Sequence, residues 1–254
     1  MNAKRTDASD ERSPSATKRL ARFAGAVYLA LALATAFGFY HAPLVQEDLS
    51  VIGRMLTKSD LRFHVAVVAD VIAAALSVPL ALLLYELFRP IDRLQSALMA
   101  LFLLVSMPVS FVVALNYVAA QSLLSGVALV AAIPEMQRQA LGTLFLTLHT
   151  HGVLAVEIFW GLWLLPFGWL VIRSRYLPPI IGVLLIIGGL AYVAHSLTSL
   201  LLGGQRIATY ERVTMFARAA AEFPAILWLV IKGAEARVDA QGLTKRSSQP
   251  LTGP

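Results

Sequence analysis

Several ionisable residues lie inside long apolar runs of this sequence, where a charged side chain is costly, and six of them are candidates for a common site. An ionisable group in hydrocarbon costs about 2.5 kcal/mol or more, so each one is a candidate functional residue. Acids can bind a proton or a cation, histidines can relay a proton, and both can ligate a metal ion. The candidates for one polar site are Asp70, His149, Glu157, His195, Arg218 and Glu222.

The depth of these residues within their runs suggests a common layer. A helix rises about 1.5 Å per residue, so the distance of each residue from the outer end of its apolar run can be counted. Four of the candidates lie roughly 12–14 Å from that end: Asp70, His149, His195 and Glu222. Glu157 lies roughly 24 Å from either end of its long run, near the middle. The sequence therefore predicts a polar layer to which four segments contribute.

Three functions are compatible with this set of residues. The favoured one is binding or transport of a small solute or ion, in which Asp70, Glu157 and Glu222 bind a proton or cation. The second is an intramembrane metal-dependent hydrolase with His149, His195 and a carboxylate as ligands, although no HExxH spacing is present. The third is a non-enzymatic scaffold or regulator, whose polar residues only specify helix packing. No cofactor follows from the sequence.

Some of the charged residues also have purely structural interpretations. Arg218 and Glu222 are four residues apart in one run, so they can pair with each other on a helix. Glu86 lies near the end of its run, where it is expected to pair with Arg89. A polar group in a helix bundle can also serve only as a hydrogen-bonding contact between helices.

The elements that must position these residues are membrane-spanning helices. Of the 254 residues, 58% are hydrophobic and 14% are charged, whereas soluble domains have about 25% charged residues. Runs of about 18 or more apolar residues can cross a bilayer, and this chain has six, at residues 22–40, 62–87, 94–118, 141–172, 179–202 and 213–231. A lone strand cannot satisfy its backbone in lipid. We predict an all-α fold, a polytopic bundle of six transmembrane helices.

The polar ends of the chain predict its domain organisation. Residues 1–20 and 234–254 have no apolar periodicity and are expected to be disordered tails, which leaves 21–233 as the transmembrane domain. The first run ends in Ala34-Thr35-Ala36, which is typical of a signal-peptidase site. The long polar leader favours a retained first helix. A cleaved signal is the alternative.

The stretch between the third and fourth runs is harder to interpret. Residues 119–140 contain an apolar core, 127–133, that is too short to span a bilayer, so we expect an interfacial segment. Pro134 followed by Glu135 then predicts a new helix start, because proline and an acid both favour a first turn.

The basic residues predict the orientation. With both termini in the cytoplasm, 14 of the 21 Lys and Arg residues fall on the cytoplasmic side, including the short turns Arg89–Arg93 and Arg173–Arg175. This asymmetry accounts for the net charge of +6 without a nucleic-acid partner. We expect the lipid bilayer as the partner and the inner or plasma membrane as the location. The chain has no cysteine, which excludes disulfides and thiolate ligands.

Several blocks in the apolar runs resemble a known family. They are LLLYELFRP at 82–90, LTLH at 146–149, RSRYLP at 173–178, GGLAY at 188–192 and the segment 222–233. In this order they resemble a bacterial membrane protein family named domain of unknown function 4386, from about residue 20 to residue 233.

The resemblance implies a six-helix fold but no activity. It also implies an acid in the second helix, a histidine in the fourth and a glutamate in the sixth, which match Asp70, His149 and Glu222. His195 stands where the family pattern suggests an aspartate, so any shared chemistry at that position is in doubt.

Overall fold

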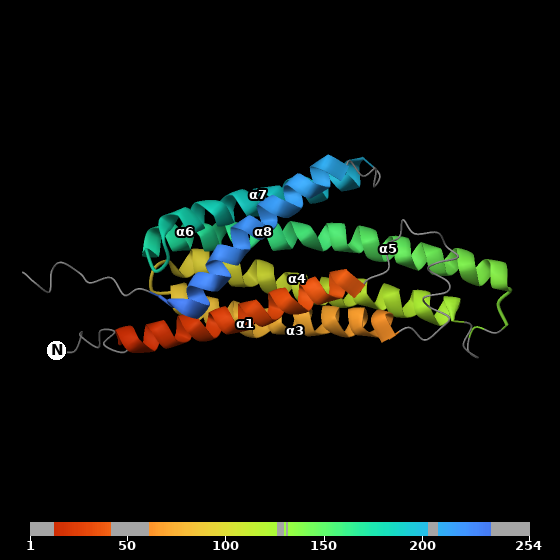
Figure 1. The fold of residues 1–254 in the computed structure, drawn as a ribbon, viewed down its shortest axis with the longest axis horizontal. Helices are drawn as coiled ribbons and strands as arrows, with labels where there is room; N and C mark the ends of the chain where they lie inside the picture. The colour runs from red at the N-terminus through yellow and green to blue at the C-terminus, as the bar shows by residue number, and fades with distance from the viewer. Residues whose placement is uncertain (1–12, 42–60, 126–129, 131, 203–207, 235–254) are drawn as a thin grey trace, which may run out of the picture.

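The computed structural model describes residues 13–41, 61–125, 130, 132–202 and 208–234 of an all-helical protein. Its helices (Figure 1) are α1 (Pro14–His41), α3 (Leu61–Phe88), α4 (Arg93–Leu124), α5 (Glu135–Leu162), α6 (Leu164–Ser174), α7 (Pro179–Leu201) and α8 (Ala208–Ile231). Within the described ranges there is no strand, and six spans are long and apolar enough to cross a membrane. The structure therefore confirms the predicted all-α bundle.

The first helix begins earlier than the apolar run suggested. α1 starts at Pro14, and the Oγ of Ser13 accepts a hydrogen bond from the N–H of Ala16 at 3.3 Å. Proline suits the first position of a helix because its missing N–H would have no partner there. The expectation that residues 14–20 belong to a disordered tail is therefore wrong. Residues 1–12 lie outside the described residues.

The segment between α4 and α5 differs in part from the prediction. α4 continues to Leu124, into the stretch 119–140 that we expected to be interfacial, because its last turns still pack against α5. Pro134 is the N-cap of α5 and Glu135 is its first residue, which confirms the predicted helix start. Residues 126–129 lie outside the described residues.

The fourth apolar run forms two helices rather than one. α5 ends at Leu162 and α6 begins at Leu164, with Trp163 between them. Pro166 lies in the first turn of α6 and has no N–H to donate to the carbonyl of Leu162, so the helical ladder is interrupted there. The expected single helix is thus broken, although α5 and α6 together still form one membrane span.

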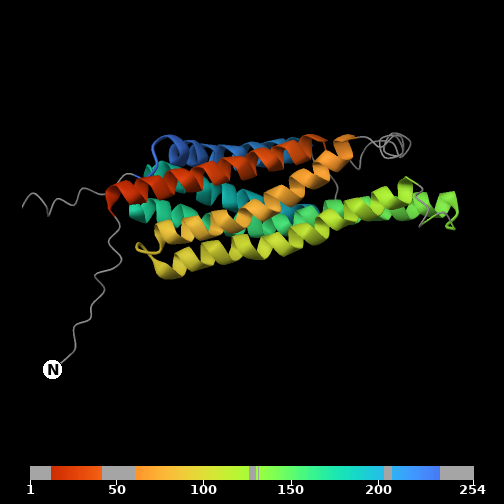
Figure 2. The same ribbon diagram turned by 90° about the horizontal axis from the view of Figure 1, so that it is seen from below.

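The six spans form a closed ring in which neighbours in sequence are neighbours in space. Contacts join α1 to α3, α3 to α4, α4 to α5, α5 to α7, α7 to α8, and α8 back to α1. Figure 2 shows α1 lying between α8 and α3. Consecutive spans run in opposite directions (Figure 1). The start of α1, the turns α3–α4 and α6–α7, and the end of α8 therefore lie at one end of the bundle.

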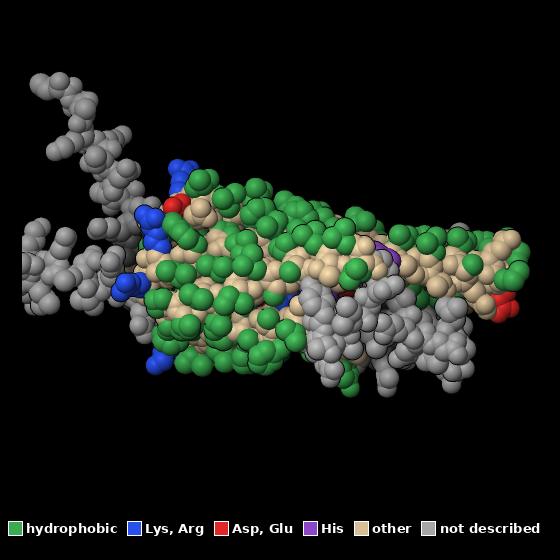
Figure 3. All heavy atoms as spheres, turned by 90° about the horizontal axis from the view of Figure 1, so that it is seen from above, with side chains coloured by type: hydrophobic (Ala, Val, Ile, Leu, Met, Phe, Trp, Pro, Cys, Tyr) green, Lys and Arg blue, Asp and Glu red, His purple; other side chains and the backbone are tan. Residues whose placement is uncertain are grey.

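Basic side chains gather at this end of the bundle, termed the basic end below. The space-filling view shows the described Lys and Arg side chains concentrated there (Figure 3). They include Lys18, Arg19, Arg22, Arg93, Arg173, Arg175 and Lys232, all exposed. Both short arginine-containing turns that the sequence assigns to the cytoplasm belong to this end.

The main hydrophobic core fills the half of the bundle next to the basic end. It draws on the first halves of α1, α4 and α7, on the second half of α3, on α6 and on the end of α8. The second buried cluster of described hydrophobic residues lies nearer the opposite end, termed the far end, and is small: Tyr117, Ala120 and Leu146. Tight apolar packing is thus concentrated in the half of the bundle next to the basic end.

Aromatic rings form a continuous chain through the main core. Their ring centres lie 5.4–5.8 Å apart from one ring to the next, in the order Tyr28, Trp163, Phe167, Phe88 and Tyr176. The last of these lies in the α6–α7 turn, where burial raises the pKa of the Tyr176 hydroxyl and keeps it neutral. The chain of rings connects the middle of the bundle to the basic end.

The end of α8 depends on a glycine that packs against α1. The N–H groups of Lys232 and Gly233 both donate to the carbonyl of Trp228, at 2.8 and 3.0 Å. Arg22 Nη2 donates to the carbonyl of Ile231 at 2.9 Å. Gly233 has φ of +73°, and a Cβ there would lie 2.9 Å from the Lys18 carbonyl oxygen. Glycine is favoured at this position because of both its φ and the close approach.

We expect Gly233→Ala to lower the free energy of unfolding by about 1–2 kcal/mol, because an L-residue is disfavoured in the left-handed region. Equilibrium unfolding of the purified protein in mixed micelles measures this change. Gly233→Asn is the comparison, since asparagine tolerates the left-handed conformation but still carries a Cβ. An alanine variant as stable as the wild type would contradict the prediction.

Candidate functional site

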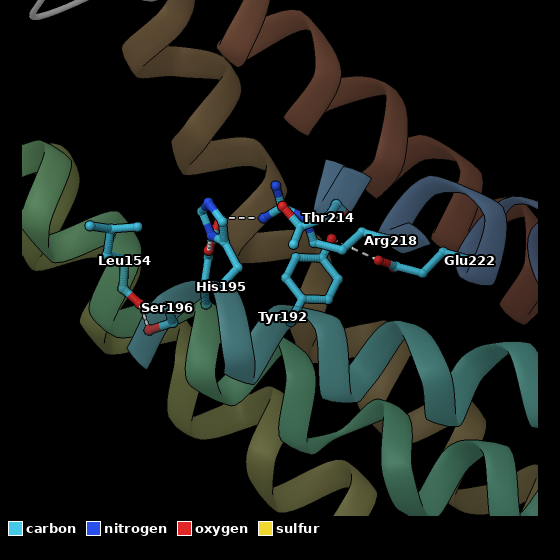
Figure 4. Close-up of polar contacts among 8 residues, drawn as sticks. Leu154, Tyr192, His195, Ser196, Thr214, Arg218 and Glu222 are labelled. Atoms are coloured by element: carbon cyan, nitrogen blue, oxygen red, sulfur yellow. Dashed lines mark hydrogen bonds and ion pairs between the residues drawn. The ribbon is translucent and has the colours of Figure 1, made fainter. Parts of the chain in front are cut away.

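A buried ion pair joins three of the membrane-spanning helices. Glu157 on α5 is buried, with 7% of its side chain exposed. Its Oε1 accepts a hydrogen bond from Nη1 of Arg218 on α8 at 2.7 Å, and its Oε2 lies 2.7 Å from Nδ1 of His195 on α7. Figure 4 shows Arg218 extending from α8 toward His195. Both carboxylate oxygens therefore have a strong hydrogen-bonding partner.

Arg218 is held in place by two further contacts. Its Nε donates to the carbonyl oxygen of Thr214 at 3.2 Å, one turn earlier on α8. Its guanidinium lies 4.9 Å from the ring centre of Tyr192, within the range of a cation–π interaction. The sequence suggested that Arg218 could pair with Glu222 on its own helix, but the ion-pair contact of Arg218 is with Glu157 on α5.

Glu222 is held between two tyrosines from different helices. The Tyr28 hydroxyl on α1 donates to Oε2 at 2.5 Å, and the Tyr192 hydroxyl on α7 donates to Oε1 at 2.8 Å. Tyr28 is fully buried. Figure 4 shows the Tyr192 hydroxyl directed at Glu222. Each oxygen of this carboxylate thus receives one phenolic hydrogen bond.

These contacts form one connected group, termed the polar cluster. Tyr192 links its two parts, because its hydroxyl binds Glu222 while its ring faces the Arg218 guanidinium. The members of the polar cluster are Tyr28, Glu157, Tyr192, His195, Arg218 and Glu222. They come from α1, α5, α7 and α8, so the cluster exists only when these four helices are assembled.

A serine fixes the relative position of α5 and α7 beside the cluster. The Oγ of Ser196, next to His195 in the chain, donates to the carbonyl oxygen of Leu154 on α5 (Figure 4). Ser196 is fully buried. This contact joins two helices through a backbone group, which positions the His195 ring relative to Glu157.

Asp70 and His149 form a separate pair. His149 Nε2 on α5 lies 3.9 Å from Asp70 Oδ2 on α3, and the His149 ring stacks on Tyr117 of α4 with the ring centres 3.5 Å apart. Gly38 of α1 lies against the Asp70 carboxylate, since a Cβ at Gly38 would be 2.7 Å from Oδ1. The six predicted site residues therefore fall into two groups rather than one layer.

The geometry of α5 explains this division. His149 and Glu157 are eight residues apart, which corresponds to about 12 Å of rise and a turn of about 80° around the helix axis. His149 therefore faces α3 and α4, whereas Glu157 faces α7 and α8. Counting depth along the runs does not reveal this difference in direction.

Glu86 and His151 make local contacts within or beside their own helices. Glu86 pairs with Arg89 at 3.0 Å, as the sequence predicted. His151 Nδ1 lies 3.0 Å from the Thr147 carbonyl oxygen of its own helix.

Tyr28 and Tyr192 are the cluster members that sequence reasoning missed. Both lie inside apolar runs, where an aromatic residue is expected to fill space in the core. Their hydroxyl groups are the only sequence signal, because a buried tyrosine hydroxyl needs a hydrogen-bonding partner. Finding that partner requires knowing which helices are neighbours.

The arrangement suits protons and small cations better than a coordinated metal. In the part of the chain that the structure describes, no three His, Cys, Asp or Glu side chains gather closely enough to hold a metal ion. His149 and His195, both suggested as ligands of one metal, belong to different pairs. The carboxylates, the imidazole and the phenols of the polar cluster can instead accept, donate and share protons.

Comparison with known proteins places the chain in a family. The family model described as Domain of unknown function (DUF4386) matches residues 23–233, which include every described span except the first residues of α1. No curated protein and no solved structure matches the chain. The match covers the whole polar cluster and the Asp70–His149 pair, and it confirms the resemblance seen in the sequence. The chain belongs to the DUF4386 family.

Proposed function

We propose that the protein binds a small solute or ion within the membrane and transports it, and that the polar cluster takes up a proton or small cation as part of this activity. The observation that carries the proposal is the composition of the polar cluster. Its described side chains include two carboxylates, Glu157 and Glu222, but one guanidinium, that of Arg218, which pairs with Glu157.

This composition leaves one negative charge to be balanced. With both carboxylates ionised, Arg218 neutralises only one of them, and an unbalanced charge in a low-dielectric interior is costly. The balance can come from a proton on His195, from a proton on Glu222, or from a bound cation. Uptake and release of one positive charge is the step that a proton-coupled or cation-coupled carrier requires.

The hydrogen bonds around Glu222 support reversible proton uptake. A phenol can donate one hydrogen bond and can also accept one. While Glu222 is ionised, Tyr28 and Tyr192 both donate to it. When Glu222 is protonated, one of these phenols can accept the new proton instead, so the same residues accommodate either state.

We also infer that the basic end faces the cytoplasm, in the inner or plasma membrane, with both termini on that side. The support is the gathering of exposed Lys and Arg at this end (Figure 3). Cytoplasmic loops carry an excess of Lys and Arg, and the rule is strongest for short loops such as Arg89–Arg93. Solute bound at the polar cluster would then reach the cytoplasm past the main hydrophobic core.

Direct measurement of bound protons tests the proposed function. We expect the purified wild-type protein to take up one proton more than Glu222→Gln when the solution is titrated with acid. Glu157→Gln should also take up one proton fewer than the wild type, because either variant leaves one carboxylate for one guanidinium. The measurement is the change in pH of an unbuffered protein solution on addition of acid, followed with an indicator dye.

Glu86→Gln is the matched control for this titration. Glu86 is also paired with an arginine, but it lies at the basic end and its side chain is 36% exposed. Glu86 has no contact with the polar cluster among the described interactions, so the variant should follow the wild-type curve. Identical curves for wild type, Glu222→Gln and Glu157→Gln would contradict the proposal and favour a scaffold whose cluster serves only packing.

A further inference from the structure

The Asp70–His149 pair lies outside the polar cluster and joins α3 to α5. The two side chains differ in exposure, with 34% of Asp70 and 9% of His149 accessible. At 3.9 Å, Nε2 and Oδ2 are close enough for an ion pair but too far apart for a direct hydrogen bond. The pair therefore combines a partly exposed acid with a histidine that is enclosed by the protein.

The position of the Asp70–His149 pair in the bundle indicates which end of the bundle it lies nearer. Tyr117, which stacks on His149, belongs to the small cluster near the far end. The half next to the basic end is filled by the main hydrophobic core and its chain of aromatic rings, from Tyr28 to Tyr176. Because apolar packing offers no group that can carry a proton, a polar path to the cluster is expected from the far end.

Helix α5 connects the two groups. It carries His149 of one acid–histidine pair and Glu157 of the other, about 12 Å apart along its axis. The pair near the far end is partly exposed, whereas the Glu157–His195 pair is buried, with 7% of each side chain exposed. Exposure thus decreases from Asp70 through His149 to Glu157, in the order expected of groups that pass a proton inward.

We infer that Asp70 and His149 are the proton-exchange pair through which protons reach the polar cluster from the membrane face at the far end. This inference rests on the proposed function. Asp70 takes a proton from water and passes it to Nε2 of His149, which restores the carboxylate and forms an imidazolium. The imidazolium then releases one proton, which water molecules carry along α5 to Glu157 or His195.

The described neighbours of the pair come from α1, α4 and α5. α1 presents the backbone of Gly38, which has no ionisable group, and α4 presents Tyr117. On α5, His151 is engaged with the Thr147 carbonyl oxygen of its own helix. Gly38 leaves space for the carboxylate, since a Cβ there would lie 2.7 Å from Oδ1.

The rate of proton uptake by the polar cluster tests the inference. Trp163 lies 5.5 Å from Tyr28 and Trp160 lies 6.5 Å from Tyr192, so tryptophan fluorescence should report on both tyrosines that hold Glu222. After a rapid drop in pH, we expect His149→Gln to slow the fluorescence change about a hundredfold, which is the lower end of the range for a lost proton-transfer group. The final amplitude should equal that of the wild type, because the polar cluster is intact.

Two further variants complete the kinetic experiment. Asp70→Asn should slow the change in the same way, and its partly exposed position makes it the safer variant for folding. His151→Gln, two residues from His149 on the same helix, should keep the wild-type rate. Wild-type rates in both His149→Gln and Asp70→Asn would overturn the inference while leaving the proposed function intact. A wild-type protein with no fluorescence change would overturn both.

The direction of access can be tested because the chain contains no cysteine. We expect Asp70→Cys in proteoliposomes to react with a charged, membrane-impermeant thiol reagent added at the far end and not at the basic end. Leu84→Cys, at a fully buried position of the main core, is the control and should react from neither side. Reaction of Asp70→Cys from the basic end alone would overturn the assigned direction.

Discussion

Replacement of Arg218 by methionine is expected to lower the free energy of unfolding by about 3–5 kcal/mol, the range found when one partner of a buried ion pair is removed. The variant leaves Glu157 as a buried carboxylate, with 7% of its side chain exposed, and His195 as its remaining partner. Methionine retains much of the arginine's length, so the loss reports mainly on the charge and its hydrogen bonds.

A double-mutant cycle separates this charge effect from general disruption. Glu157→Gln combined with Arg218→Met removes both charges, so we expect the double variant to be less destabilised than the sum of the single variants by at least about 1 kcal/mol. Equilibrium unfolding of all four proteins in mixed micelles gives the coupling energy. Additive losses would show that the Glu157–Arg218 pair is not the reason for the instability.

Arg89→Met is the matched control for the arginine substitution. Arg89 pairs with Glu86 at 3.0 Å, but both side chains are about one-third exposed at the basic end. Solvent screens such a pair, so its loss should change the free energy of unfolding by less than about 1 kcal/mol. A loss as large as that of Arg218→Met would indicate that burial is not what distinguishes the two pairs.

The second large effect is expected from Gly161→Val, which would separate α5 from α7. A Cβ at Gly161 would lie 2.5 Å from the carbonyl oxygen of Gly189 and 2.9 Å from Cβ of Tyr192. These atoms cannot move away unless α7 moves as a whole. Because α7 also carries His195, the substitution should displace residues that hold both carboxylates of the polar cluster.

We expect Gly161→Val to lower the free energy of unfolding by about 1–3 kcal/mol, as overpacking in a core does, and to abolish the proton uptake assigned to the cluster. Unfolding in mixed micelles and the dye titration measure the two effects on one preparation. Gly142→Val is the matched control, since the nearest atoms there belong to the side chain of Leu124 at the end of α4, which can rotate away. Equal effects of the two substitutions would contradict the argument.

The spans of this protein were predictable because few solutions exist in a bilayer. Hydrocarbon thickness sets the length of each apolar run, and the need to satisfy every backbone group requires helices. Local signals also predicted the start of α5 at Glu135. The early start of α1 has a signal as well, Ser13 followed by Pro14, but that signal is weak beside the polar composition of the tail.

The partners of the candidate residues were not predictable in the same way. Depth along a helix follows from counting residues, but direction changes by about 100° with each residue. Spacing gives the angle between two residues of one helix, but it does not give the rotation of that helix about its axis or the helices that it faces. This is why His149 and Glu157 could be placed on one helix but not assigned to different pairs.

By itself, the sequence determined the number of spans, the choice of helix over strand, the family and the set of ionisable residues that enter the bundle. These properties depend on composition along the chain, which the bilayer constrains strongly. Only the tertiary structure decided that Glu157 pairs with Arg218 and His195, that two tyrosines hold Glu222, and that Asp70 pairs with His149 elsewhere. Those contacts depend on which helices are neighbours and on the rotation of each helix about its axis. Both follow from the packing of all six spans together.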